Sequence, residues 1–226
     1  KKRIGKFLFM KIALGSAQFG SSYGIANSEG KVLLRQVGEI LSIALQNKVD
    51  LIDTAVSYGE SELALGSIGV DRFDVVTKLP ALPNYIADVD SWVASEVGNA
   101  LKRLGVRSIY GLLLHQSESL LGSKGGKLVT ALERLKNAGT VEKLGVSIYD
   151  PSELDVISGI MDLDLVQGPL NIVDRRIISS GWLTKLSNSG VEFHARSVFL
   201  QGLLLLNRNE IPEKFESWAT IWNFWH

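Results

Sequence analysis

The sequence predicts an α/β fold of the (β/α)8 barrel class, with about seven β/α units visible in 226 residues. Short apolar stretches of strand length alternate with helical patterns, and the connections between them are short. This alternation is typical of a parallel sheet whose faces are covered by helices. An open doubly wound sheet is the alternative, and it should carry a Gly-x-Gly-x-x-Gly fingerprint after its first strand. Gly15 and Gly20 are five residues apart with no third glycine at the right place, so a barrel is favoured.

Each predicted strand is a short run of apolar, often β-branched residues bounded by turn residues. The first runs into a glycine-containing segment, residues 15–20, which we expect to be a loop. The predicted strands cover residues 11–14, 51–53, 73–79, 109–114, 141–148, 163–166 and 191–195.

Apolar residues spaced three and four apart predict the helices. In residues 32–48, for example, Val37 and Leu41 lie on one helical face. Asp150 followed by Pro151 predicts the N-cap and first turn of another helix. The predicted helices cover residues 32–48, 61–68, 90–104, 128–136, a segment after Asp150, 175–187 and the aromatic tail 211–226.

We expect residues 1–226 to form a single barrel domain. Barrels of this class typically have about 250 residues, so the eighth unit is expected to be missing and the C-terminal part truncated. Residues 1–9 are basic and then briefly apolar, too short a pattern for a signal peptide. We interpret them as an N-terminal extension, either an extra strand at the barrel or a segment appended before Met10.

Composition excludes several classes of function. Lys plus Arg is 24 and Asp plus Glu is 24, so the chain lacks the positive excess that nucleic-acid binding uses. There is no cysteine, which excludes disulfides, cysteine–zinc sites and thiol nucleophiles. No apolar run approaches the roughly 18 residues of a membrane span. We therefore expect a cytoplasmic protein that binds neither nucleic acid nor membrane.

Polar residues gather where the predicted strands end, and in barrels the active site forms there because the loops converge. Asp53, Lys78 and His115 end or interrupt apolar strands, where an ionisable group is costly without a partner. Tyr58 lies in the loop after Asp53. The same edge carries Ser147, Gln167, Asn171, Arg196 and Ser197.

Four of these residues form a coherent chemical set. The Tyr58 phenol, with an ordinary pKa near 10, is a poor proton donor at pH 7. We expect the Lys78 ammonium to lower that pKa and Asp53 to hold the lysine charged and oriented. A neutral His115 can donate a hydrogen bond to a carbonyl oxygen. No metal-ligand cluster accompanies them, so a hydride for such a carbonyl would come from an organic cofactor.

Several segments together are similar to the aldo-keto reductase family, of the bacterial type. The chain resembles that family from about residue 11 to residue 206, and the spacing of Asp53 and Tyr58 is the most specific feature. The resemblance implies NADPH-dependent reduction of aldehydes or ketones with Tyr58 as general acid, supported by Asp53, Lys78 and His115. The segments that carry it are residues 14–20, 53–59, 77–78, 113–115, 145–147, 167–171 and 195–203.

The resemblance also implies a binding site for NADP(H). Three polar residues, Ser147, Gln167 and Asn171, would lie along the nicotinamide carboxamide. Arg196 would stand where the family commonly stacks an aromatic ring on the nicotinamide. The loop near the pyrophosphate would be formed by Ser197, Phe199, Leu200 and Gly202.

Three departures from the family pattern stand out. The family commonly has Ser-Asn after the fifth strand, whereas this chain has Ser147-Ile148. Arg196 replaces the stacking aromatic ring and brings a positive charge. The eighth unit, which commonly grips the adenosine 2′-phosphate, is not found. The aromatic tail, with Trp218 and Trp222, is expected to be a helix whose apolar face packs on the barrel or would have packed on the missing residues.

Two functions therefore remain open. One is an NADPH-dependent reductase acting on a small-molecule carbonyl substrate. The other is a catalytically inactive barrel that serves as a nucleotide-sensing or structural module. A barrel without one strand leaves two unpaired parallel edges. Either the chain is a fragment of a longer protein, or the gap is closed by the aromatic tail or by a partner, and a second copy of the chain in that place would make a homodimer.

Overall fold

Seven parallel strands form the centre of the molecule in the computed structural model, which describes residues 11–225. They follow each other in chain order, so that each strand pairs with the next one along the sequence. The extension predicted for residues 1–9 lies outside the described residues. The strands are β1 (Ala13–Gly15), β2 (Leu51–Asp53), β3 (Asp74–Leu79), β4 (Ile109–Leu114), β5 (Val141–Ser147), β6 (Leu165–Pro169) and β7 (Glu192–Arg196).

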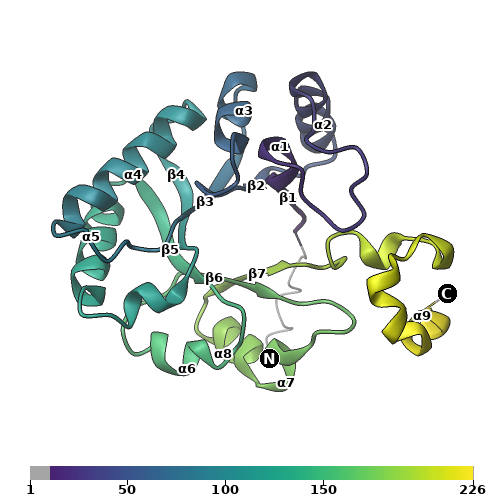
Figure 1. The fold of residues 1–226 in the computed structure, drawn as a ribbon. Helices are drawn as coiled ribbons and strands as arrows, with labels where there is room; N and C mark the ends of the chain where they lie inside the picture. The colour runs from purple at the N-terminus through teal and green to yellow at the C-terminus, as the bar shows by residue number, and fades with distance from the viewer. Residues whose placement is uncertain (1–10, 226) are drawn as a thin grey trace, which may run out of the picture.

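Helices follow the strands and lie outside the curled sheet (Figure 1). This is the arrangement that the alternating pattern predicts, and the observed bounds differ from the predicted ones by a few residues. The helices are α1 (Ala17–Gly20), α2 (Leu34–Gln46), α3 (Ser61–Ile68), α4 (Val89–Leu104), α5 (Gly125–Asn137), α6 (Glu153–Ile157), α7 (Arg176–Ser179), α8 (Trp182–Asn188) and α9 (Ala219–Trp225).

The sheet is a curled half-barrel. Within residues 11–225, β1 pairs with β2 and β7 pairs with β6, and no eighth strand joins these two edges. The prediction of a (β/α)8-type fold with seven visible units is confirmed. Because all the strands are parallel, their carboxyl ends meet at one edge of the barrel, and this edge carries the candidate site.

Two apolar layers hold the sheet in place. The larger one lies between the strands and the helices and includes Val37, Leu104 and Leu128, all fully buried. The smaller one fills the inside of the curled sheet with Leu51, Val76, Leu113 and Leu165. Gly145 lies beside this inner layer, where an added Cβ would stand 1.7 Å from the Leu165 carbonyl oxygen.

Two local predictions are wrong. Residues 17–20 form the short helix α1 and not a loop. The cap predicted at Asp150 is present: its Oδ1 accepts from the Ser152 N–H at 3.0 Å, and the Glu153 carboxylate accepts from the Asp150 N–H at 2.7 Å, just before α6 begins at Glu153. The helix predicted over residues 175–187 is broken into α7 and α8 at Gly181, whose φ is +79°.

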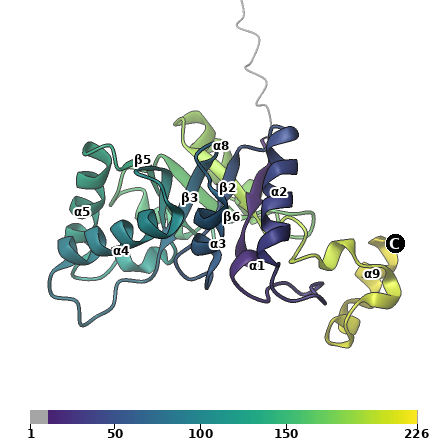
Figure 2. The same cartoon turned by 90° about the horizontal axis from the view of Figure 1, so that it is seen from above.

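The aromatic tail does not pack on the barrel wall as predicted. Residues 203–225 lie to one side of the barrel, next to the loop between α1 and α2, in both views (Figures 1 and 2). Their buried side chains form a separate cluster of Leu203, Leu204, Ile211 and Trp222, with Ile25 of the α1–α2 loop against it. The tail therefore contacts the barrel through a loop and not through a helix, and residue 226 lies outside the described chain.

Candidate active site

The predicted site residues lie at the carboxyl edge of the half-barrel. The strands set their positions. Asp53, Ser147 and Arg196 are the last residues of β2, β5 and β7, respectively. Lys78 and Gln167 lie within β3 and β6, and His115 directly follows β4. Tyr58 lies in the loop between β2 and α3.

A buried ion pair forms the centre of the site. The Lys78 side chain is 0% exposed, and its Nζ donates to Asp53 Oδ1 at 2.7 Å and Oδ2 at 2.8 Å. It also donates to the Thr54 carbonyl oxygen at 2.8 Å. Gln167 Nε2 donates to Asp53 Oδ1 at 2.7 Å from the opposite side of the barrel interior. Both charged groups are therefore held by several fixed partners, which offsets the cost of burying them.

Tyr58 lies next to this pair. Its hydroxyl is 3.4 Å from Lys78 Nζ, and its ring centroid is 5.9 Å from that of His115 in an edge-to-face arrangement. One ring nitrogen of His115, Nδ1, is 3.0 Å from Ser57 Oγ. The predicted set of Asp53, Tyr58, Lys78 and His115 is thus brought together in one place.

Two glycines let the Tyr58 loop approach the β1–α1 segment. A Cβ on Gly20 would lie 1.7 Å from the Tyr58 carbonyl oxygen, and one on Gly59 would lie 2.6 Å from the Gly20 carbonyl oxygen. Gly59 also has a φ of +58°, which favours glycine. Buried Ser61 ties the two segments further, because its Oγ donates to the Ser16 carbonyl oxygen at 2.9 Å. The backbone that carries Tyr58 is therefore rigidly supported.

Burial dominates the titration of the site. It raises the pKa of Tyr58, and the Asp53 carboxylate raises it further. It lowers the pKa of Lys78, against the opposing effect of Asp53, and it lowers the pKa of His115, where the Lys78 charge adds to it. The prediction that Lys78 lowers the pKa of Tyr58 is wrong in this structure, because Asp53 compensates the ammonium and the phenol is desolvated.

The residues predicted to contact a carboxamide separate into two groups. Ser147 and Gln167 are buried at the inner edge, at 3% exposure each. Of their side-chain polar atoms, only Gln167 Nε2 has a hydrogen-bond partner among residues 11–225. Asn171 is used within the protein: its Nδ2 donates to the Ser197 carbonyl oxygen at 3.1 Å, and its Oδ1 accepts from two backbone N–H groups. Asn171 therefore holds the loop after β7, and its bonds do not point to a ligand.

Arg196 lies over an aromatic ring. Its guanidinium carbon is 4.4 Å from the centroid of the Tyr149 ring, and its Nη2 donates to the Ile148 carbonyl oxygen at 2.9 Å. Tyr149 was not singled out by sequence reasoning, because an exposed tyrosine after a strand has no distinguishing spacing.

The loop after β7 is strained. Ser197, Leu200 and Gln201 have φ values of +56°, +48° and +57°, and Gly202 has +88°. Such conformations cost about 1 to 3 kcal/mol each in residues other than glycine and gather at ligand-binding sites. The N–H groups of Val198, Phe199, Gln201 and Gly202 donate to no acceptor within residues 11–225. Phe199 itself is half exposed.

Sequence reasoning also missed two hydrogen-bond partners of the predicted set Asp53, Tyr58, Lys78 and His115. Ser57 bonds His115, and the Thr54 carbonyl accepts from Lys78. Both belong to the segment 53–59 that carries the resemblance, so proximity in sequence was the available signal. Backbone carbonyl roles leave no trace in residue type.

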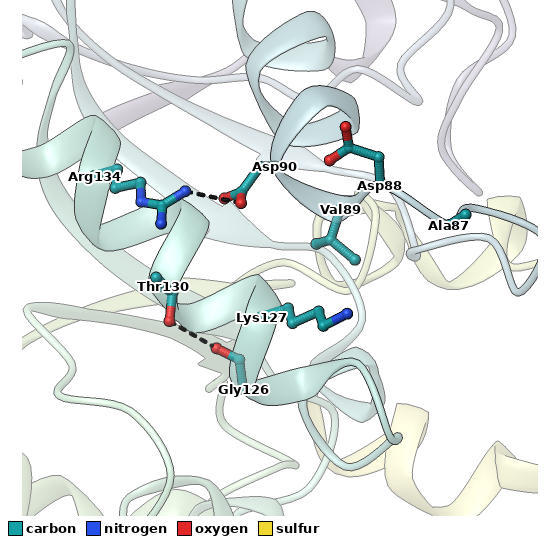
Figure 3. Close-up of a pocket in the computed structure, with 8 residues that line it drawn as sticks. All are labelled: Ala87, Asp88, Val89, Asp90, Gly126, Lys127, Thr130 and Arg134. Atoms are coloured by element: carbon teal, nitrogen blue, oxygen red, sulfur yellow. Dashed lines mark hydrogen bonds and ion pairs between the residues drawn. The ribbon is translucent and has the colours of Figure 1, made fainter.

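The described chain also has hollows away from these residues. One of about 940 Å³ lies at the amino ends of β3, β4 and β5, next to Asp74, Tyr110 and Glu142, and none of the predicted site residues lines it. A hollow of about 330 Å³ lies between α4 and α5, where the Asp90 and Arg134 side chains pair at 2.8 Å (Figure 3). None of the predicted site residues lines it. Within residues 11–225, no three His, Asp or Glu side chains gather into a metal-binding group. Over the same range, no helix has both the length and the apolar character needed to cross a membrane.

Comparison with known proteins identifies the class. Residues 11–220 match the aldo/keto reductase family, and the chain belongs to that family. Among curated proteins, none matches the sequence significantly.

Solved structures share the fold. An aldo-keto reductase from Bacillus halodurans in its holo form has a TM-score of 0.71 at 19% identity, and the match covers 90% of this chain and 66% of the Bacillus chain. The glycerol dehydrogenase of Gluconobacter oxydans has a TM-score of 0.68 at 25% identity, covering 89% and 64%. An aldo-keto reductase from Klebsiella pneumoniae in complex with NADPH has a TM-score of 0.65 at 18% identity, covering 84% and 64%. The chain thus spans about two thirds of the length of these structures.

Proposed function

We propose that this chain is an oxidoreductase that reduces an aldehyde or ketone to an alcohol, with NADPH as the hydride donor and Tyr58 as the proton donor. One observation carries the proposal. The Tyr58 hydroxyl lies 3.4 Å from a fully buried Lys78 ammonium, which is itself held by Asp53, and the His115 ring stands beside it. This arrangement presents a proton and a hydrogen-bond donor to the same small volume.

Tyr58 would act as the general acid. Its raised pKa keeps the phenol protonated at neutral pH, so the proton is present when the substrate arrives. As hydride adds to the carbonyl carbon, negative charge grows on the oxygen, and an alkoxide is more basic than a phenolate. The proton then moves from Tyr58 to that oxygen, and the nearby Lys78 ammonium stabilises the phenolate that remains.

His115 would orient the carbonyl. Burial and the Lys78 charge lower its pKa, so the ring is neutral at pH 7 and one ring nitrogen carries a proton. Ser57 bonds Nδ1, which leaves Nε2 as the nitrogen that can face a substrate. A neutral imidazole donates a hydrogen bond without adding charge beside Lys78.

The polar groups at the site fit a nicotinamide cofactor, which would supply the hydride when bound. A carboxamide needs one donor and one acceptor, and the Ser147 hydroxyl and the Gln167 carbonyl oxygen provide them. The unpartnered N–H groups of the strained loop 197–202 suit an anionic diphosphate. Ser197, Phe199, Leu200 and Gly202 belong to this loop, Arg196 precedes it, and Asn171 supports it through the Ser197 carbonyl oxygen.

The proposal is tested by titrating NADPH and NADH separately while following the emission of the five tryptophans, and by assaying reduction of a nitrobenzaldehyde. We expect saturable NADPH binding, discrimination against NADH, and turnover. Saturable binding without turnover would favour the nucleotide-sensing alternative. Binding of neither cofactor would refute the reductase and the nucleotide-sensing module, and would leave the inactive structural barrel.

A further inference from the structure

Arg196 brings a second positive charge to the catalytic edge. Its side chain is half-buried, and no carboxylate among residues 11–225 pairs with it. Elsewhere on the described surface, arginines commonly do have acidic partners: Arg176 pairs with Asp150 at 2.6 Å and with Asp174 at 2.8 Å. An unpaired, partly desolvated guanidinium is costly, so its presence beside a catalytic set calls for a ligand.

The position of this charge is fixed. One face of the guanidinium lies on the Tyr149 ring at 4.4 Å, and Nη2 is bound to the Ile148 carbonyl oxygen at 2.9 Å. The backbone is anchored by the pairing of Arg196 with Pro169 at the end of the β6–β7 ladder. Arginine has five N–H donors, and only the bond to Ile148 and a long one of 3.4 Å to Ser197 Oγ use them.

The charges at the site do not cancel. Asp53 and Lys78 neutralise each other through their bonds of 2.7 and 2.8 Å. The Asp150 and Asp174 carboxylates beside Tyr149 are taken up by Arg176. Arg196 therefore leaves an excess positive charge. It lies close enough to oppose, in small part, the rise in the pKa of Tyr58 and to add a little to the lowering of the pKa values of Lys78 and His115 by burial.

We propose that Arg196 makes this site selective for aldehydes and ketones that carry an anionic group such as a carboxylate. The inference rests on the proposed reductase function. A fixed charge acts through space over several ångströms at low dielectric, so it favours an anionic substrate at Tyr58 whether it contacts the substrate or the cofactor beside it. Neutral aldehydes gain nothing from it.

The test compares two aldehydes of similar shape, 4-carboxybenzaldehyde and its neutral methyl ester, in the wild type and in Arg196→Gln. We expect the wild type to have the higher kcat/KM for the carboxylate. In Arg196→Gln the ratio of the two kcat/KM values should fall about tenfold or more, as is typical when a charged hydrogen bond is lost. Arg196→Lys keeps the charge and should keep most of the preference.

Arg175→Gln is the matched control. Arg175 is exposed before α7, and its side chain makes no hydrogen bond or ion pair within the described residues, so the variant changes net charge equally without touching the site. It should leave the ratio unchanged. A wild type without preference for the carboxylate, or an Arg196→Gln variant with an unchanged ratio, would overturn the inference.

A binding measurement separates this inference from the proposed function. Calorimetric titration with benzoate and with benzamide, each with and without NADPH, requires no turnover. The wild type should bind benzoate more tightly, and Arg196→Gln should lose that difference. If the wild type reduces no aldehyde, the reductase proposal fails. Equal binding of the two probes by the wild type would then overturn the charge selectivity as well.

Discussion

Replacing Asp53 with asparagine tests whether the buried pair is what the geometry indicates. The Lys78 side chain is 0% exposed and Asp53 is 18% exposed, and two of the three short bonds of the ammonium go to this carboxylate. Removing one partner of a buried pair leaves an uncompensated charge, which costs about 3 to 5 kcal/mol of unfolding free energy. Urea unfolding followed by tryptophan emission measures that loss at pH 7.

The loss should depend on pH in a defined direction. Burial already lowers the pKa of Lys78 and Asp53 opposes it, so Asp53→Asn lowers this pKa further. Between the folded pKa and the ordinary lysine value near 10.4, the unfolded chain binds a proton that the folded chain does not. Stability therefore rises with pH in this window, and the deficit of the variant should shrink as pH increases.

Two controls make the result specific. Asp53→Asn combined with Lys78→Met removes both charges and should be more stable than Asp53→Asn alone. Glu39→Gln breaks an exposed pair with Arg35 and should cost less than about 0.5 kcal/mol. A loss below about 1 kcal/mol for Asp53→Asn would lie in the range of a surface pair. Such a loss, or a deficit independent of pH, would refute the claim that the variant leaves the Lys78 ammonium buried without a compensating charge.

Three further predictions follow from the same structure. Gly20→Ala should lower both stability and carbonyl reduction, because the new Cβ would meet the Tyr58 carbonyl oxygen at 1.7 Å. Gly98→Ala, in the middle of α4 with nothing within 4 Å of the new Cβ, should instead stabilise the protein by about 0.5 to 1 kcal/mol. Equal changes in the free energy of unfolding in urea would contradict this prediction. The lowered pKa of His115 predicts that the acid-side decline of kcat/KM is centred below the ordinary histidine value of about 6.5, and a decline centred at or above that value would show that the ring is not desolvated. Within residues 11–225 the outer edges of β1 and β7 pair with no further strand, and the prediction that a second copy of the chain covers them would be excluded by a clean monomer in sedimentation at tens of micromolar.

The sequence predicts the strands, and the gathering of polar residues at their carboxyl edge, well because both depend on local signals. Asp53, Lys78 and His115 stand out as ionisable residues at the ends of apolar runs, and parallel strands bring their carboxyl ends together. The break at Gly181 and the helix over residues 17–20 were missed because short helices give too few residues for a periodic pattern.

Long-range contacts account for the rest. The Gln167–Asp53 bond joins residues 114 positions apart, and nothing in either strand indicates it. The pKa of Tyr58 depends on desolvation, which residue type does not report, so the expected lowering by Lys78 was wrong. The tail packs on Ile25 of the α1–α2 loop and on its own leucines, a contact between segments far apart in the sequence.

Reduction of a nitrobenzaldehyde by the wild type and by Tyr58→Phe, both saturated with NADPH, tests the central claim most directly. The variant keeps the ring and loses only the hydroxyl 3.4 Å from Lys78 Nζ. We predict that turnover is abolished while NADPH affinity, read from tryptophan quenching, changes little. Unchanged turnover in Tyr58→Phe would show that the proton comes from elsewhere and would contradict the account.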